Sequence, residues 1–219
     1  MQYVIIIDMT KNVSYVALLA DIIGSRTLPP RERARLQDDL REALHAVNRR
    51  WRPKIAAGFA IARGDEIQGL LKDASAVWDI AHWLRQAFPT VNWIMACGLG
   101  PITTALAHTA VEVDGPCFHA ASAALEDAKR HRQVFVFRGF PPAVDGLAAY
   151  YSALYWSWTP RQRRQAAALR LDDAGTPQIE RVKVHPTAIS HMKRRMAWPL
   201  VADGDRMLRA ALGATGEVR

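Results

Sequence analysis

Cysteine is scarce in this sequence, and long apolar runs are missing from it. The two cysteines, Cys97 and Cys117, have neither zinc-ligand spacing nor a disulfide framework around them, which is typical of a reducing compartment. No apolar stretch approaches the roughly 18 residues of a membrane span. Segment 2–9 is apolar but too short for a signal peptide. The sequence therefore predicts a cytoplasmic protein without a membrane partner.

Low-complexity tracts are also missing, and half of the 219 residues are hydrophobic. Such a composition allows a buried core and argues against global disorder. The net charge of +8 is uneven: residues 1–150 hold 17 Lys/Arg and 15 Asp/Glu, whereas residues 151–219 hold 12 and 6. The last third is thus where a nucleic-acid partner is expected, the alternative being a solvated basic surface.

Hydrophobic periodicity predicts an α+β fold for the first two thirds of the chain. Strands are expected at 15–21, 55–61, 66–71, 93–99 and 133–137, and helices at 31–50, 73–88 and 117–130. Gly64 marks a tight hairpin between the second and third strands. The first elements give the order strand, helix, two strands, helix, strand. This order is typical of a ferredoxin-like sheet with helices on one face.

The prolines at 141 and 142 interrupt this pattern, and we expect domains 1–142 and 143–219. Helices are predicted at 147–155, 160–171, 176–183, 187–198 and 205–212, which describes a small all-α domain. The segment 176–198 resembles the helix-turn-helix of sigma-factor region-four or LuxR-type regulators. The resemblance implies that 187–198 contacts DNA, and the alternative is a packing or dimerisation module. The polar side chains expected at DNA are those of Thr187, Ser190, His191, Lys193, Arg194 and Arg195.

Two aspartates are candidates for a metal site. Asp21 ends a predicted strand and Asp65 follows Gly64 at the hairpin tip. In a ferredoxin-like sheet these strands are neighbours, so the carboxylates can converge on Mg²⁺ or Mn²⁺ that also binds phosphate oxygens. The alternative is that Asp65 is only a turn residue and Asp21 a strand-end cap.

The segment after Asp21 is a candidate phosphate contact. Gly24 and Ser25 precede a predicted helix start, where backbone N–H groups favour an anion, and Arg26 adds a positive charge. These three residues are predicted to bind a nucleotide phosphate.

Four short motifs together resemble the SatD family of bacterial proteins. They are residues 20–26 (ADIIGSR), 64–71 (GDEIQGLL), 98–103 (GLGPIT) and 114–116 (DGP). The resemblance extends over nearly the whole chain, including the basic C-terminal third, but it implies no particular activity.

The N-terminal part also resembles, more distantly, the catalytic domain of class III nucleotide cyclases. This resemblance places Asp21 and Asp65 at the two metal-binding aspartates and Glu112 near the purine-recognising acid. His119 falls at an asparagine position, where it would donate to phosphate or be a partly buried helix histidine without a ligand. Ala123 replaces an arginine that stabilises charge on the transferring phosphate. That family builds its sites at dimer interfaces, which implies a homodimer.

The sequence thus predicts a nucleotide-binding, DNA-binding regulator with a magnesium cofactor. Ala123 argues against rapid turnover, so an enzyme is not the favoured interpretation. One alternative is an active nucleotidyltransferase or cyclase that uses Asp21 and Asp65. A second alternative is a non-catalytic protein-interaction module.

Overall fold

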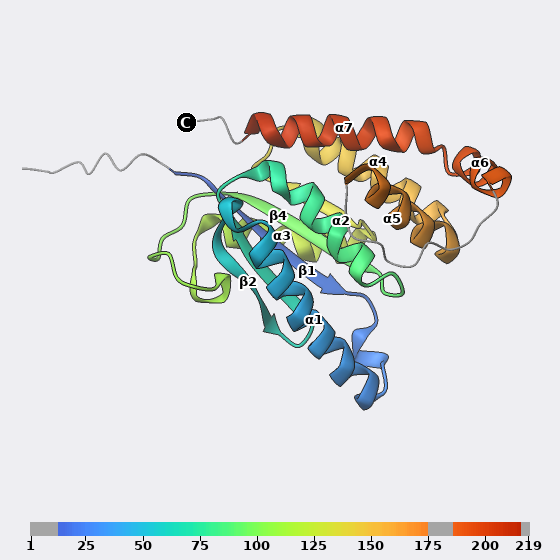
Figure 1. The fold of residues 1–219 in the computed structure, drawn as a ribbon. Helices are drawn as coiled ribbons and strands as arrows, with labels where there is room; N and C mark the ends of the chain where they lie inside the picture. Colours follow the sequence, from blue (N-terminus) through green and yellow to red (C-terminus); the bar gives the residue numbers. More distant parts are fainter. Residues whose placement is uncertain (1–12, 175–185, 216–219) are drawn as a thin grey trace, which may run out of the picture.

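The computed structural model describes residues 13–174 and 186–215, and Figure 1 shows their arrangement. The strands are β1 (Tyr15–Ile22), β2 (Ile55–Arg63), β3 (Glu66–Leu71), β4 (Trp93–Gly100) and β5 (Phe135–Arg138). The helices are α1 (Pro30–Arg50), α2 (Val77–Ala87), α3 (Pro116–His131), α4 (Pro142–Ser157), α5 (Pro160–Ala174), α6 (Pro186–Arg195) and α7 (Trp198–Thr215). The protein is therefore a mixed α+β structure, as its sequence predicts.

One five-stranded sheet organises the molecule, with strand order β2-β3-β1-β4-β5. Strand β1 lies in the centre and pairs antiparallel with β3 and β4, while β5 runs parallel to β4. Consecutive residues from Val16 to Ala20 are all at most 2% exposed. A strand buried on both faces has no polar alternation, which explains why β1 reads as a continuous apolar run.

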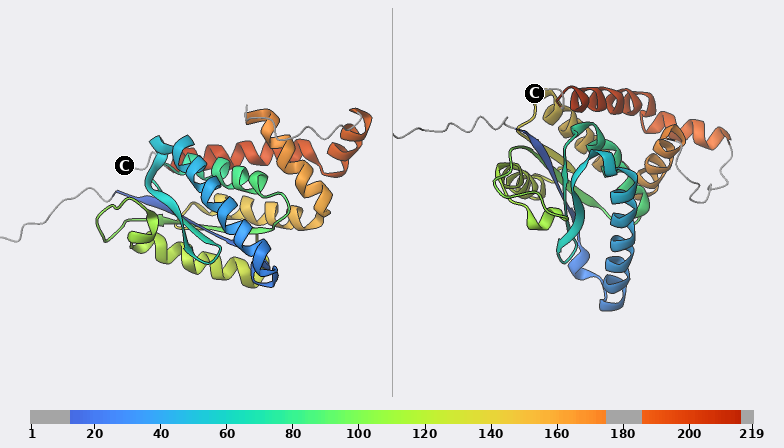
Figure 2. Two further views of the ribbon diagram at one scale, coloured as in Figure 1. Left: turned by 60° about the horizontal axis from the view of Figure 1, so that its bottom comes forward. Right: turned by 60° about the vertical axis from the view of Figure 1, so that its left-hand side comes forward.

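Helices α1 and α2 cover one face of the sheet, and α3 covers the other. Side chains of Leu18 and Ala20 pack in the core under α1 and α2, whereas Ala17 and Leu19 pack under α3. Figure 2 shows α3 on the opposite side of the sheet from α2. The alternation of side chains along β1 therefore builds two separate cores.

Helix α3 approaches β4 very closely, and a glycine makes this approach feasible. A Cβ atom on Gly98 would lie 2.1 Å from the carbonyl oxygen of Cys117 and 2.5 Å from the nitrogen of Ala121. Only the missing side chain lets the two backbones pack at this distance. This contact fixes the path of α3 along the sheet.

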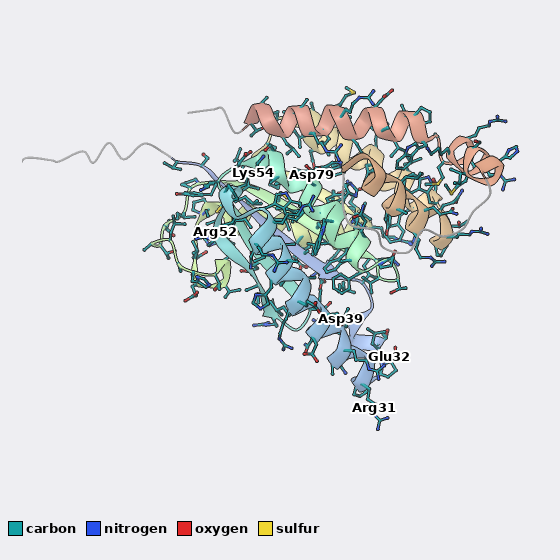
Figure 3. All side chains as sticks on the ribbon, viewed as in Figure 1. Arg31, Glu32, Asp39, Arg52, Lys54 and Asp79 are labelled. Atoms are coloured by element: carbon teal, nitrogen blue, oxygen red, sulfur yellow. The ribbon has the colours of Figure 1, made fainter. Side chains whose placement is uncertain are left out.

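The C-terminal helices pack on α2 and β5 and extend the core that lies between the sheet and helices α1 and α2. Tyr151 on α4 and Leu208 on α7 belong to the buried cluster that also contains Trp78 of α2. Asp79, labelled in Figure 3, accepts a 2.7 Å hydrogen bond from Arg209 Nε on α7. One hydrophobic cluster thus joins the sheet layer to the helices that follow it.

Several helix boundaries differ from the predicted ones. Helix α4 begins at Pro142 rather than residue 147, and α7 begins at Trp198 rather than Asp205. The chain turns between α6 and α7 because Met196 is buried and Ala197 has a left-handed φ of 50°. The predicted helix 176–183 lies outside the described residues. Within residues 13–174 and 186–215, no helix is long and apolar enough to cross a membrane.

Candidate functional site

The end of β1 and the tip of the β2–β3 hairpin lie side by side. The Asp65 carboxylate accepts a 3.2 Å hydrogen bond from the backbone N–H of Ile22, the residue after Asp21. Gln37 on α1 donates to the carbonyl of Gly64 at 3.1 Å and holds the hairpin tip from the other side. The antiparallel register of β1 and β3 therefore brings Asp65 to the same end of the sheet as Asp21.

Lysine 129 in the last turn of α3 completes this cluster. Its ammonium lies 3.0 Å from the Asp21 carboxylate and 3.3 Å from Glu126. Asp21 points to the α3 face of the sheet because it follows Ala17 and Leu19 in the strand alternation. Partial burial alone would lower the pKa of Lys129, but the Asp21 and Glu126 carboxylates raise it above its usual value. The ammonium therefore stays charged throughout the neutral range.

Lys129 was not among the predicted site residues. It stands in the basic run Lys129-Arg130-His131, which is a common ending of a helix because it interacts favourably with the helix dipole. No local pattern distinguishes it from Arg130. Only the packing of α3 on β1 shows that Lys129 points to Asp21.

The two predicted metal ligands lie at the same end of the sheet, and each carboxylate already has a partner in the chain. Asp21 and Asp65 supply hard carboxylate oxygens, which Mg²⁺ prefers in small number beside phosphate. The described part of the chain contains no group of three or more acidic, histidine or cysteine side chains that could form a metal site. A metal at Asp21 would also require the Lys129 ammonium to leave that carboxylate.

The turn after Asp21 is shaped by glycine. Gly24 has a φ of 80°, a conformation that favours glycine, and it precedes the short 3₁₀ helix Ser25–Thr27. Ser25 is buried, whereas Arg26 is exposed. The Thr27 hydroxyl donates to the Gly24 carbonyl at 2.7 Å, which stabilises the turn. Gly24 and Arg26 are therefore the members of this predicted group that solvent reaches freely.

His119 lies in the first turn of α3, at the opposite end from Lys129, and Glu112 lies in the short 3₁₀ helix Ala110–Glu112 that precedes α3. Helix α3 begins beside the end of β4, where Cys117 N–H donates to the carbonyl of Pro101 at 3.3 Å. From His119 to Lys129 the helix rises about 15 Å. Within one chain these predicted nucleotide contacts therefore do not meet Asp21.

Glu112 and His119 each contact a neighbouring side chain. The Thr109 hydroxyl and backbone N–H donate to Glu112 at 2.6 and 3.2 Å and hold the pKa of Glu112 below its usual value. His119 Nε2 lies 3.1 Å from Asp114, and its side chain is 71% exposed. The interpretation of His119 as a partly buried helix histidine is therefore wrong, because it stands on the outer face of α3. Ala123 is exposed on the same helix.

Helix α6 presents basic side chains to solvent. His191, Arg194 and Arg195 are exposed and Lys193 is half-buried. Ser190 is exposed and engaged in an interaction, and Thr187 lies in the first turn of the helix. In Figure 1, α6 stands at one end of the molecule, beyond the start of α7. The helix predicted to precede it in a helix-turn-helix lies outside the described residues.

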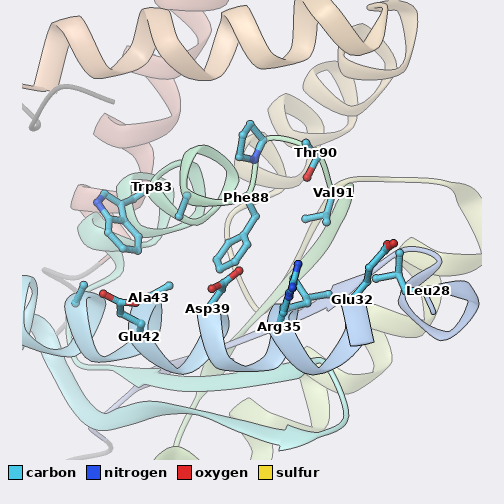
Figure 4. Close-up of a pocket in the computed structure, with 14 residues that line it drawn as sticks. Leu28, Glu32, Arg35, Asp39, Glu42, Ala43, Trp83, Phe88, Thr90 and Val91 are labelled. Atoms are coloured by element: carbon cyan, nitrogen blue, oxygen red, sulfur yellow. The ribbon is translucent and has the colours of Figure 1, made fainter. Parts of the chain in front are cut away.

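A groove of about 600 Å³ lies between α1 and α2, and Figure 4 shows its lining. Trp83, Phe88 and Val91 form its apolar side, whereas Glu32 and Asp39 point into it from α1. None of the predicted site residues lines this groove. Its carboxylates would repel a phosphate, so it is not the candidate site for a nucleotide.

The fold and the cluster together define a mixed α+β protein whose central sheet carries two aspartates and a lysine at one end. Comparison with protein families identifies it further: a model of the SatD family matches residues 15–133, from β1 to the end of α3. This match covers more than half of the 219 residues, and the chain belongs to the SatD family. No curated protein matches the sequence. Residues 134–219, which contain α4 to α7, lie outside the family match.

Proposed function

We propose that this SatD-family protein binds a nucleotide through its phosphates at the end of β1 and responds to it as a DNA-binding regulator. The observation that carries the proposal is the cluster of Asp21, Asp65 and Lys129. It places two carboxylates, the kind of group that binds magnesium, beside one ammonium, which pairs with phosphate. Solvent reaches the cluster, since the Asp21 and Lys129 side chains are 25% and 33% exposed.

The strand arrangement supports a ferredoxin-like, cyclase-like palm. Strands β2, β3, β1 and β4 are adjacent in this order and pair antiparallel, and α1 and α2 cover one face. The resemblance to class III cyclases implies that the two carboxylates at this end of the sheet bind the metal. The ligand class we propose is a nucleoside triphosphate with Mg²⁺.

Lys129 has a distinct role in this proposal. Without a ligand it neutralises Asp21 at 3.0 Å, which limits the repulsion between two carboxylates at one sheet end. With a magnesium–phosphate complex bound, Asp21 and Asp65 hold the metal and the ammonium turns to a phosphate oxygen. A lysine on a flexible stem can make this exchange without movement of the backbone.

A second copy of the chain would complete the nucleotide site. His119 lies about 15 Å from Lys129 along the axis of α3, and Glu112 lies in the 3₁₀ helix that precedes α3. In a head-to-tail homodimer, these residues of one copy can face Asp21 of the other. We therefore propose that the metal and phosphates bind at one copy and that Glu112 and His119 of the second copy contact the nucleoside or phosphate.

Helix α6 is the proposed DNA contact, in a helical domain that comprises residues 143–219. Its exposed His191, Arg194 and Arg195 and half-buried Lys193 form a basic surface at one end of the molecule. Such side chains bind phosphates and base edges in a major groove. Thr187 and Ser190 lie on the same helix and would add polar contacts.

Thermal unfolding with nucleoside triphosphates, with and without Mg²⁺, tests the nucleotide proposal. A ligand of the folded state should raise the melting temperature in a saturable way that depends on Mg²⁺. Lys129→Met should weaken binding roughly tenfold to a hundredfold, since a hydrogen bond between charged groups contributes about 1.5–3 kcal/mol. Asp65→Asn should remove the dependence on Mg²⁺.

Arg130→Met is the matched control, because Arg130 is the next residue of α3 and its side chain is 70% exposed. It should leave binding unchanged. If no nucleoside triphosphate shifts the melting temperature of the unmodified protein, the nucleotide proposal is rejected. Rapid release of pyrophosphate would instead favour the enzyme alternative, which the alanine at position 123 argues against.

Salt-dependent DNA binding tests the second half of the proposal. The logarithm of the binding constant should fall linearly with the logarithm of salt concentration, and Arg194→Ala should reduce this slope by about 1. Arg206→Ala is the control, because Arg206 is a 71% exposed arginine on α7 outside the proposed surface. Absence of binding even at low salt, or equal effects of both substitutions, would reject α6 as the contact.

A further inference from the structure

A second, much smaller cavity lies where α2 meets α4 and α5. It has a volume of about 20 Å³ and is separate from the cluster at the end of β1. Its lining is rich in cations and aromatic rings and contains no carboxylate: it includes His82, Arg85, Tyr151, Tyr155, Trp158, Arg163 and Arg170. A cavity lined by cations and hydrogen-bond donors favours a ligand that accepts hydrogen bonds.

Arg85 is the central group, because it is a buried cation with incomplete hydrogen bonding. The residue is 6% exposed. Its Nη2 donates to the carbonyls of Trp93 and Val134 at 2.9 and 3.2 Å. In the part of the chain that the structure describes, its Nε and Nη1 have no hydrogen-bond partner. Burial lowers the pKa of the guanidinium and Tyr155, which lies beside it, raises this pKa, but no described residue offers these two donors a hydrogen bond of good geometry.

Two further residues of the lining carry unpaired buried atoms. Trp158 is 4% exposed and its Nε1 has no partner among the described residues, and the same holds for His82 Nε2. An unsatisfied buried polar atom costs about 1–3 kcal/mol. A ligand that accepts hydrogen bonds would pair these atoms on all three residues, with the proton of the neutral His82 imidazole on Nε2.

The charge balance distinguishes an anion from a water molecule. Arg170 is neutralised by Asp205 at 2.7 Å. The described residues, in contrast, provide no ion pair for Arg85, whose guanidinium instead faces the rings of Phe135 and Tyr155 at 4.8 and 4.9 Å. A ring contributes about 0.5–2 kcal/mol to such a cation, which is less than the several kcal/mol that burial of a charge costs. Arg163 adds a further positive charge to the lining.

We propose that this cavity binds a small inorganic anion, of the size of chloride, on Arg85, Trp158 and His82. The volume of about 20 Å³ exceeds the ~10–15 Å³ that one water-sized particle needs. It excludes phosphate, sulfate and nucleotides, so this site is independent of the nucleotide site proposed above. The anion joins α2 of the sheet layer to α4 and α5 and acts as a structural counter-ion between them.

Thermal and urea unfolding of the full chain test this proposal when chloride or bromide replaces gluconate at constant ionic strength. Because the anion binds only the folded state, the unfolding equilibrium constant should fall about tenfold for each tenfold rise in halide above its dissociation constant. Trp158→Phe removes the Nε1 donor and keeps an aromatic ring. It should shift the halide dependence of the unfolding equilibrium to severalfold higher halide concentration. Trp51→Phe, remote from the cavity, should leave it unchanged.

Crystals grown in bromide provide a second readout that does not depend on any variant. An anomalous bromide peak in the cavity, together with the halide-dependent stability, is the expected result. A cavity that contains only a water molecule, or a stability that is the same in gluconate and halide, would overturn the proposal. Equal halide dependence of the Trp158→Phe and Trp51→Phe variants would overturn the assignment to this cavity.

Discussion

Replacing Asp205 by asparagine should weaken the attachment of α7 far more than its small change in shape suggests. Asp205 accepts hydrogen bonds from Arg170 Nε at 2.7 Å and Nη2 at 3.2 Å, and from Trp78 Nε1 at 3.1 Å. The Arg170 and Asp205 side chains are only 4% and 6% exposed. The substitution keeps the volume and one acceptor oxygen, but it leaves the Arg170 guanidinium buried without a counter-charge.

The expected loss follows from this burial. Removing one partner of a buried ion pair costs about 3–5 kcal/mol. For a protein of 219 residues, each kcal/mol lowers the melting temperature by roughly 2–4 °C. Asp205→Asn should therefore lower it by about 6–20 °C. Asp203→Asn on the same helix is the control, because its 55% exposed pair with Arg206 should contribute less than about 1 kcal/mol.

A double variant separates the charge effect from the packing effect. Arg170→Met with Asp205→Leu removes both charges, and replacement of a buried pair by apolar residues is often neutral or stabilising. Trp78 Nε1 would still lose its acceptor, at a cost of about 1–3 kcal/mol. The double variant should thus be more stable than Asp205→Asn in urea unfolding at pH 7. The reasoning fails if Asp205→Asn costs no more than its control, or if the double variant is the less stable of the two.

Three further substitutions test the packing and the buried histidine. Gly98→Ala should lower the free energy of unfolding by about 3 kcal/mol or more, because the added Cβ would overlap the α3 backbone. Gly146→Ala should raise the free energy of unfolding by about 0.5–1 kcal/mol, because its Cβ meets nothing within 4 Å in α4. Equal urea midpoints for the two would contradict the close approach of α3. Burial, then the charges of Arg170 and Arg85, lower the pKa of His82 well below its usual value. The unfolded chain therefore binds a proton near pH 6.5 that the folded chain does not, and stability should fall as the pH drops through about 6.5. His82→Gln should flatten this part of the stability profile, and an unchanged profile would contradict a neutral His82.

The amino-acid sequence determined the secondary structure of the sheet layer well. The apolar run from Tyr15, the helical periodicity ahead of Trp51, and Gly64 at the hairpin each predicted an element that the structure contains. These signals are local: side-chain alternation, helical spacing and turn geometry act over a few residues. The coarse α+β class therefore followed from the sequence.

Boundaries in the C-terminal third were less predictable. The helix expected to end at Trp198 stops at Arg195, and α7 begins where that helix was expected to end. The break depends on Met196, which is buried, and on the left-handed backbone of Ala197. Neither residue is a helix breaker by itself, so only their tertiary environment decides the turn.

The sequence alone also named Asp21 and Asp65, because each carboxylate follows an apolar strand or a glycine turn. It did not reveal that Lys129 pairs with Asp21, or that His119 stands at the opposite end of the same helix, with Glu112 just before that helix. Residues 21 and 129 are distant in sequence, and their pairing requires α3 to pack along β1 after its close approach at Gly98. Local patterns fix which residues a segment presents. The long-range packing of a helix on a sheet decides which of them meet.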